Sequence, residues 1–364
     1  MFICGFIVRG GGTQDACAPR ISEGLQAMRK ILGMGGGTGL PVLLAGLKEF
    51  AQDPDGPSPP TGVSISAIVS TSDDGGSSGR LSRTFGIPAV GDLRNCLAAL
   101  APNSFELPEL FQHRFSAGAG LQGHSLGNLI VTALCEKYGS LGLAIQTAAR
   151  LLRSHGCILP ATEVQTTLCA EFEDGSVMRG ESQVASAGKR IRSVWLEPEY
   201  PPPFPGVLEV IANADVIVLG PGSLYTSIIP SLLVEDVIQA IRCSPALKIF
   251  ICNLTTQPGE TEAFTASDHL RVLQSHIGQR VIDICVMSSD PVPQIAGSET
   301  RVKPVRNDPQ EIARMGVVPI QAGLLAREGP WVRHDPKKLA HLILSIADAL
   351  PRPGAVYDEG GLVA

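Results

Sequence analysis

A repeated succession of strand, glycine turn and helix is the feature that most constrains how this 364-residue chain can fold. "KILGMGGGTGLPVLLAGLKEF" and "ADVIVLGPGSLYTSIIPSLLV" both follow this order. In the first, leucines at 40, 43, 44 and 47 recur at helical spacing. Short apolar strands that alternate with helices are typical of a parallel sheet covered on both faces. The sequence therefore predicts an α/β fold with a mostly parallel sheet.

Two regions depart from this alternation. Residues 91–155 contain mostly helical patterns, which predicts a helical subregion, and "TTLCAEFEDGSVMRGESQV" predicts a small β-hairpin region that turns at Asp174 and Gly175. Asp335 followed by Pro336 marks the start of a last helix. We expect one domain over residues 28–350 and a tail at 351–364. Either Met28 is the natural start, or residues 1–27 are a loose extension.

Composition narrows the classes of function. Hydrophobic residues make up 44% and charged residues 18%, enough apolar material for a sizeable core. The net charge of −6 argues against a broad surface for nucleic acid, and no apolar run reaches the ~18 residues of a membrane span. The nine cysteines show no C-x-x-C pair or zinc spacing, which favours free thiols in a reducing compartment. We therefore expect a cytoplasmic protein.

The glycine-rich turn "GMGGGTG" suggests a phosphate site. It follows a strand and opens a helix, so backbone N–H groups at the helix start can hold an anion. The turn matches neither G-x-G-x-x-G nor the Walker A pattern. A tight turn that only packs helix on strand is the alternative. The predicted phosphate-binding residues are Gly35, Gly36, Gly37, Thr38 and Gly39.

The stretch "SDDGGSSGR", together with "GDLRN", has far more polar residues than a turn requires. Two adjacent carboxylates repel each other unless they bind hydroxyls, a cation or a metal, and arginine can bind phosphate. Asp73 and Asp74 are thus candidates for sugar hydroxyls or for Mg²⁺, and a helix-capping role would explain only one of them. The predicted residues for ligand hydroxyls, other polar groups or metal are Asp73, Asp74, Ser77, Ser78, Arg80, Asp92, Arg94 and Asn95.

A second ligand edge is predicted from "GHSLGN", "LGPGSLYTS" and two later positions. "GHSLG" fits the serine-hydrolase pattern G-x-S-x-G, but a flexible-looking loop precedes it instead of a strand, so Ser125 reads as a helix start. Hydrolysis at Ser125 stays a remote alternative, and His124 is either a ligand donor or a structural histidine. The second edge comprises His124, Asn128, Gly220, Pro221, Gly222, Ser223, Tyr225, Thr226, Asn253 and Phe264.

Six motifs in the same order resemble the bacterial gluconeogenesis factor family, YvcK-like or UPF0052, related to the 2-phospho-L-lactate transferases (CofD-like). They are "ILGMGGGTGLPVLLAGLK", "AIVSTSDDGGSSGRL", "GDLRNCLAAL", "GHSLGNLI", "ADVIVLGPGSLYTSIIPSLLV" and "CNLTTQPGETEAFTASDH". The resemblance runs from about residue 30 to residue 350. It implies a cytoplasmic α/β protein with a Rossmann-like three-layer core.

The resemblance implies two functions. YvcK-like members look like binders of UDP-sugars, notably UDP-N-acetylglucosamine, linked to cell shape and growth on gluconeogenic carbon sources, with no established reaction. The transferase branch moves a phospholactyl group from a guanylylated donor to a deazaflavin alcohol with Mg²⁺. Many relatives carry Tyr where this chain has Phe264, which would weaken the affinity or leave the base held by stacking. The predicted partner is a small nucleotide sugar, with oligomerisation an open possibility.

Overall fold

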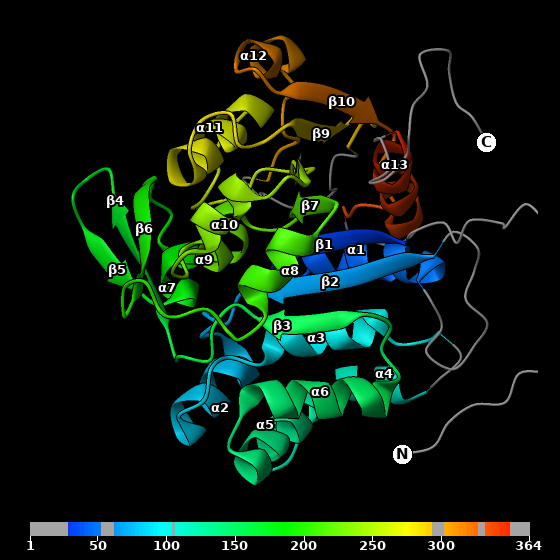
Figure 1. The fold of residues 1–364 in the computed structure, drawn as a ribbon. Helices are drawn as coiled ribbons and strands as arrows, with labels where there is room; N and C mark the ends of the chain where they lie inside the picture. The colour runs from blue at the N-terminus through cyan, green and yellow to red at the C-terminus, as the bar shows by residue number, and fades with distance from the viewer. Residues whose placement is uncertain (1–27, 52–61, 104–105, 293–301, 327–331, 350–364) are drawn as a thin grey trace, which may run out of the picture.

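A computed structural model describes residues 28–51, 62–103, 106–292, 302–326 and 332–349. Its centre is a seven-stranded sheet in the order β10-β9-β8-β7-β1-β2-β3, and every paired strand is parallel (Figure 1). The strands are β1 (Arg29–Gly35), β2 (Val63–Val69), β3 (Cys157–Pro160), β7 (Val216–Leu219), β8 (Leu247–Ile251), β9 (Ile284–Ser288) and β10 (Val318–Ala322). The prediction of a mostly parallel α/β fold is confirmed.

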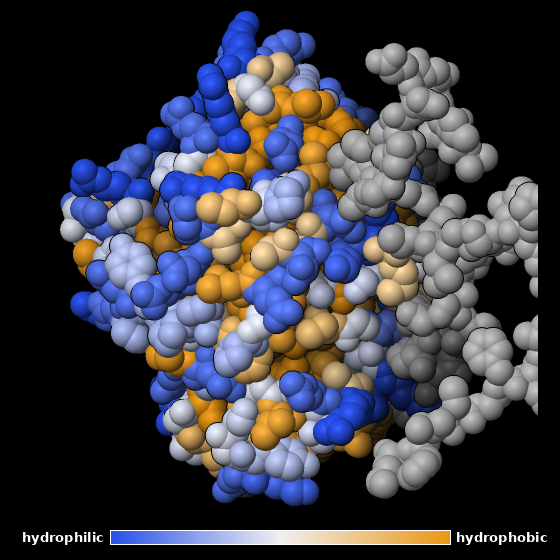
Figure 2. All heavy atoms as spheres, viewed as in Figure 1, coloured by the Kyte–Doolittle hydropathy of each residue, from blue (hydrophilic) through white to orange (hydrophobic). Residues whose placement is uncertain are grey.

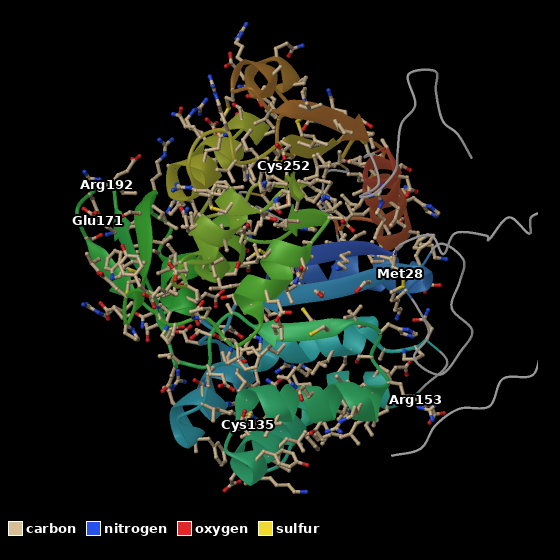
Figure 3. The ribbon with its side chains drawn as sticks, viewed as in Figure 1. Met28, Cys135, Arg153, Glu171, Arg192 and Cys252 are labelled. Atoms are coloured by element: carbon tan, nitrogen blue, oxygen red, sulfur yellow. The ribbon has the colours of Figure 1, made fainter. Side chains whose placement is uncertain are left out.

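A small antiparallel sheet lies beside the large one (Figure 1). It has the order β5-β4-β6 and consists of β4 (Thr167–Phe172), β5 (Val177–Arg179) and β6 (Ile191–Glu197). The pairing of β4 with β5 confirms the predicted hairpin. On its rim Glu171 and Arg192 form an ion pair of 3.1 Å, and both carry labels at the left of Figure 3.

Helices cover both faces of the large sheet. Their bounds are α1 (Gly39–Leu47), α2 (Gly76–Phe85), α3 (Gly91–Leu100), α4 (Leu107–Gln112), α5 (Leu126–Tyr138), α6 (Leu141–Leu152), α7 (Glu181–Ser186), α8 (Val207–Asn213), α9 (Ile229–Leu232), α10 (Val237–Cys243), α11 (Ala266–Ile277), α12 (Pro309–Arg314) and α13 (Pro336–Asp348), with short η1 (Lys48–Phe50) and η2 (Leu224–Ile228). The run α3–α6 confirms the predicted helical subregion. Asp335 caps α13 as predicted by accepting from the backbone N–H groups of Lys337 and Lys338.

Alternate residues of each strand feed two separate hydrophobic cores. Ile31 of β1 packs with α1, α3, α6 and α13, whereas its neighbour Leu32 packs on the opposite face with α8–α11 and the small sheet. Because successive side chains of a strand point to opposite faces, a parallel sheet with apolar strands needs helices on both sides. This three-layer arrangement leaves only the sheet's edges and strand ends for polar chemistry.

The carboxyl ends of β1, β2, β7 and β8 form the edge where the polar loops meet. In Figure 1 the arrowhead of β2 points towards the small sheet, α2 and α7. The loops after β1 and β7 touch so closely that a Cβ on Gly39 would collide with the backbone carbonyl of Pro221. Glycine at 39 is therefore needed for this backbone approach, and the turn joins the two halves of the sheet.

The surface in Figure 2 is mixed, with apolar side chains gathered at the upper centre near β9 and β10 and mostly polar ones over the small sheet. Among the residues described, no single helix is both long enough and apolar enough to cross a membrane. One pair of helices joined at a bend, Leu224–Leu232 and Val237–Cys243, reaches the required length and apolar composition only when its two members are counted together. Of the cysteines in the described ranges, Cys157 and Cys243 are exposed and the others buried. The predicted extension at 1–27 and tail at 351–364 lie outside the described residues.

Candidate ligand-binding site

The amino-terminal turns of four helices meet at this edge: α1, α2, α3 and α5. Hydrogen bonds join them in a chain. Asp92 of α3 accepts from the Gly37 N–H that precedes α1, and Ser78 of α2 accepts from the Gly91 N–H of α3. Ser77 of α2 contacts both the entry and the first turn of α5. Helix amino termini carry partial positive charge, so their convergence favours an anionic group nearby.

The backbone of the glycine turn is bonded to the side chain of Asp92. The Gly37 N–H donates to Asp92 Oδ2 at 2.6 Å, and a Cβ on Gly36 would lie 2.6 Å from the same oxygen. Gly37 has φ +63°, a left-handed conformation that favours glycine. The Gly37 N–H is therefore used within the protein, which leaves Thr38 and Gly39, at the start of α1, as the part of the turn best placed for a ligand.

Asp92 is a buried carboxyl in an acidic neighbourhood. Burial, reinforced by the negative charge of Asp73, raises the pKa of Asp92 to about 6, against the opposing effects of the Gly37 hydrogen bond and of Arg94. Burial and the nearby Arg114 lower the pKa of the Arg94 guanidinium to about 10. A second carboxyl, Glu181, comes from α7. Burial and the charges of Asp73 and Asp92 raise its pKa well above the ordinary range.

The two adjacent aspartates have different partners. Asp73 Oδ1 accepts from the Gly75 N–H at 2.8 Å. Asp74 Oδ1 accepts from the Ser182 N–H at 2.8 Å and also from the Ser182 hydroxyl, 108 residues later in the chain. Asp74 therefore fastens the first turn of α7, and with it the small sheet, to the loop after β2. Neither acid caps α2, whose N-cap is Gly75.

A directed chain of hydrogen bonds fixes His124. Arg94 Nε donates to Asn128 Oδ1 at 3.1 Å, so the Asn128 amide must present its Nδ2 to Ser77 Oγ, 3.1 Å away. Ser77 then donates its own proton to His124 Nδ1, at 3.0 Å. Burial, Arg80 and Arg114 lower the pKa of His124. A neutral imidazole that accepts at Nδ1 carries its proton on Nε2, so His124 is set as a hydrogen-bond donor.

Ser125 serves the fold. It is fully buried (0% exposed), and its Oγ accepts from the Asn128 N–H at 3.2 Å as the N-cap of α5, the helix start that the sequence indicated. The serine that contacts a histidine is Ser77, whose Oγ accepts a hydrogen bond from Asn128 and donates one to His124. A hydroxyl that donates to a neutral imidazole is the contact that a general base uses, but Ser77 is itself buried (2% exposed). Neither serine lines the cavity described below, so this geometry gives the hydrolase alternative at Ser125 no support.

The other wall of the site carries mainly amide and hydroxyl side chains, with Arg333 as its charged member. A cavity of about 270 Å³ lies between the glycine turn and the loops after β7 and β8. Its lining comprises Gly37, Thr38, Gly39, Val42, Pro221, Gly222, Ser223, Ser227, Asn253, Leu254, Thr255, Gln257, Val332, Arg333 and His334. Asn253 accepts from the Gly222 N–H at 3.3 Å and donates to Gln257, which donates to Ser223 Oγ at 2.5 Å. These amides therefore hold one another in fixed orientations.

Several predicted site residues lie away from this cavity. Tyr225 is buried in the core below it, and Thr226 donates to the buried Glu260 at 3.2 Å. The Phe264 ring packs edge-on against His269, with centroids 5.4 Å apart, and is not among the cavity's lining side chains. Arg80 is exposed and donates to the Gln122 carbonyl. Asn95 lines a neighbouring groove of about 640 Å³ between α1, α3 and α4.

Other residues belong to the site without having been predicted. Gln257, Arg333 and His334 line the cavity, and Glu181 joins the acids around Asp73. "RHDP" at 333–336 is interpreted from the sequence only as a helix start, and Glu181 lies in the segment assigned to the hairpin. The residues around Glu181, "GES" at 180–182, match no motif that would mark them as part of a site.

A metal bound by protein side chains alone does not fit the described residues. They bring no three His, Cys, Asp or Glu side chains together in a way that could hold an ion. Asp73 and Asp74, predicted as possible metal ligands, each use their Oδ1 in bonds to Gly75 and to Ser182, and their role as ligands stays a prediction.

Comparison with known proteins decides the family. The model of the family "2-phospho-L-lactate transferase CofD" matches residues 31–325. The chain belongs to the CofD family. It is 42% identical over 320 residues to the gluconeogenesis factor of Bacillus subtilis, covering 87% of this chain and 98% of that one. It is 39% identical over 317 residues to the gluconeogenesis factor of Listeria innocua, covering 87% and 95%.

A solved relative has the same fold. The crystal structure of a UPF0052 family member from Bacillus halodurans superposes with a TM-score of 0.81 at 41% identity, covering 88% of this chain and 99% of that one. The matched region of the family spans both walls of the site, from the glycine turn to the loops after β7 and β8, and ends eight residues before Arg333. The predicted relationship to gluconeogenesis factors and to the CofD family is confirmed.

Proposed function

We propose that this CofD-family protein is a gluconeogenesis factor that binds a nucleotide sugar of the UDP-N-acetylglucosamine type in the cavity between the glycine turn and the β7 and β8 loops. The observation that carries the proposal is the make-up of this cavity. The amino terminus of α1 and the Arg333 side chain offer positive charge, and Asn253 and Gln257 offer amide groups. Positive charge is needed to bind a diphosphate, and amide groups can form hydrogen bonds with a nucleoside or a sugar.

The geometry supports binding more directly than catalysis. The polar groups of the acidic wall are bonded to one another, and Ser77 and Ser125 are both buried away from the lining of the cavity. In the proposed function the protein acts in the cytoplasm and couples the supply of a cell-wall precursor to carbon metabolism and cell shape. A regulator of this kind binds its ligand without consuming it.

Calorimetry with UDP-N-acetylglucosamine tests this proposal. We expect saturable one-site binding to the full chain and no release of UDP over hours with the protein in excess. UDP alone should bind with lower affinity if the sugar is recognised. If neither UDP-N-acetylglucosamine nor UDP binds, the proposal is refuted. Steady release of UDP would show that the protein is an enzyme that consumes the nucleotide sugar.

A phospholactyl-type transferase is the second candidate. The matching family model and the 640 Å³ groove beside the cavity favour it. Groove and cavity share Thr38, Val42 and Arg333, so a second substrate could meet a nucleotide at that junction. Incubation with a guanylylated phospholactate donor, a deazaflavin alcohol and Mg²⁺ tests it, and a transferred phospholactyl group detected by mass spectrometry would establish it.

A further inference from the structure

His334 is an unusual member of the cavity wall. It follows Arg333 directly, the residue is only 7% exposed, and it lines the cavity together with the glycine turn and Asn253. Its Nε2 is buried and has no hydrogen-bond partner among the described residues. A buried polar atom without a partner costs free energy, commonly about 1–3 kcal/mol, so such an atom in a ligand cavity calls for an explanation.

The hydrogen bonding of the ring determines which nitrogen is protonated. The backbone of Cys252, just beyond β8 and labelled in Figure 3, raises the pKa of the imidazole, which is the effect of a carbonyl that accepts from a ring N–H. The Cys252 N–H already donates to the Val286 carbonyl at 2.9 Å, so the Cys252 carbonyl is the group left to accept from His334. Because Nε2 has no partner, the donor is Nδ1.

The ring is neutral at pH 7. Burial lowers the pKa of His334 to about 4, and the bond to Cys252 only partly offsets that effect. A neutral imidazole with its proton on Nδ1 has a bare lone pair on Nε2. His334 is therefore an acceptor, the opposite of His124, which is held as a donor by Ser77.

We propose that His334 Nε2 accepts a hydrogen bond from the nucleoside part of the ligand, so that this position selects a ligand with an N–H or O–H donor there. An imide N–H of a uracil base and a ribose hydroxyl are the two sources of such a donor. A phosphate oxygen, which only accepts, is excluded from this position. This inference rests on the proposed nucleotide-sugar site and specifies which wall recognises the nucleoside.

The test uses His334→Asn in the full chain. Asparagine can keep a donor near Nδ1 for the Cys252 carbonyl but cannot reach the position of Nε2. His341→Asn, on the exposed side of α13, is the matched control. We expect His334→Asn to weaken UDP binding at least tenfold by calorimetry with a melting temperature close to that of the control, and His341→Asn to leave affinity unchanged.

Ligand analogues identify the donor. N3-methyl-UDP lacks the imide N–H, whereas 2′-deoxy-UDP and 3′-deoxy-UDP each lack one hydroxyl. The analogue without the relevant donor should lose at least tenfold in affinity for the wild type and less than threefold for His334→Asn. Equal losses in both proteins for all three analogues would overturn the inference, as would equal affinity of wild type and His334→Asn for UDP.

A spectroscopic measurement separates this inference from the proposed function. Nitrogen-15 NMR of the ligand-free protein at pH 7 should show His334 with a protonated Nδ1 and a bare Nε2. A protonated Nε2 overturns the inference even if UDP binds. If the predicted tautomer is observed and neither UDP nor UDP-N-acetylglucosamine binds to the wild type, the proposed function fails, and the inference falls with it.

Discussion

The two walls of the site are built from different kinds of residue. The wall formed by α2, α3 and α5 contains Asp73, Asp92, Arg94 and His124, whose polar atoms are largely bonded to one another. The wall formed by the β7 and β8 loops and His334 has mainly amides and hydroxyls and keeps a buried acceptor without a protein partner. The bond from the Gly37 N–H to Asp92 indicates that the charged wall fixes the shape of the glycine turn, whereas in the proposed function the wall of amides and hydroxyls recognises the ligand.

The largest expected effect concerns the charge of Asp92. Its folded-state pKa is about 6 against an ordinary 3.8, so the carboxyl lowers stability as pH rises from about 4 to about 6, and the full cost remains above that range. Asp92→Asn keeps an acceptor for the Gly37 N–H without the charge. We expect it to raise the free energy of unfolding at pH 7.5 by up to about 3 kcal/mol, and by much less at pH 4.

Asp215→Asn is the control for this variant. Asp215 accepts from the Lys30 N–H at 2.8 Å, at the opposite end of β1. Chemical denaturation at both pH values should show no comparable gain for it. A destabilised Asp92→Asn at pH 7.5 would mean that the negative charge itself holds the turn together.

Removing the Arg333 side chain should weaken ligand binding by about 2 kcal/mol, roughly 30-fold, because a charge-assisted hydrogen bond to phosphate is lost. Calorimetry with UDP-N-acetylglucosamine at low and moderate salt measures this. Arg192→Ala, which removes an exposed positive charge from the small sheet, is the control and should bind like the wild type. Equal binding by Arg333→Ala would place the diphosphate outside this cavity.

The Asp74→Ala variant tests whether the first wall is structural. Losing both bonds to Ser182 should lower the free energy of unfolding by about 1.5 kcal/mol and speed hydrogen exchange in α7. Asp174→Ala, which breaks a similar carboxylate–serine contact in the hairpin, should leave exchange in α7 unchanged. A Mg²⁺-dependent loss of binding without a loss of stability would instead assign Asp74 to a metal.

The smallest effect is expected for Ser125→Ala. Loss of the N-cap of α5 should destabilise the fold by about 1 kcal/mol, as measured by thermal unfolding. Ser140→Ala, which removes the cap of α6, should have a similar effect and serves as the comparison. Loss of any hydrolytic activity in Ser125→Ala alone would revive the hydrolase alternative.

The fold was predictable because its signals are local. The leucine spacing of α1, the apolar runs of the strands and the Asp-Pro start of α13 each lie within one element, and the strand-end rule then placed the glycine turn and the DDGGSSGR loop at one edge. Partners distant in sequence could not be found in this way. Asp74 bonds to Ser182, and His334 reaches Cys252, only after the sheet has assembled.

Phe264 illustrates the same limit. Its position in a ligand-like motif predicts contact with a nucleotide, and that contact stays a prediction. The ring packs edge-on against His269 and against the hydrophobic core, outside the lining of the cavity. Motif membership indicates which loop lies near the site, whereas the packing of a ring depends on neighbours that are distant in the sequence. The direction of the hydrogen bonds at His124 and His334 likewise depends on neighbours that no short motif contains.

The central position of β1 has a consequence for how the chain is made. β1 pairs with β2 on one side and with β7 on the other, and the contact between Lys30 and Asp215 beside β7 spans 185 residues. At about 5–20 residues per second, a ribosome needs roughly 10–40 seconds to synthesise that interval. Throughout it, the second edge of β1 is an open strand edge, a template for pairing with other chains. The charged wall can be completed on the nascent chain well before the wall that contains Arg333 and His334, so the proposed ligand could stabilise this protein only near the end of its synthesis.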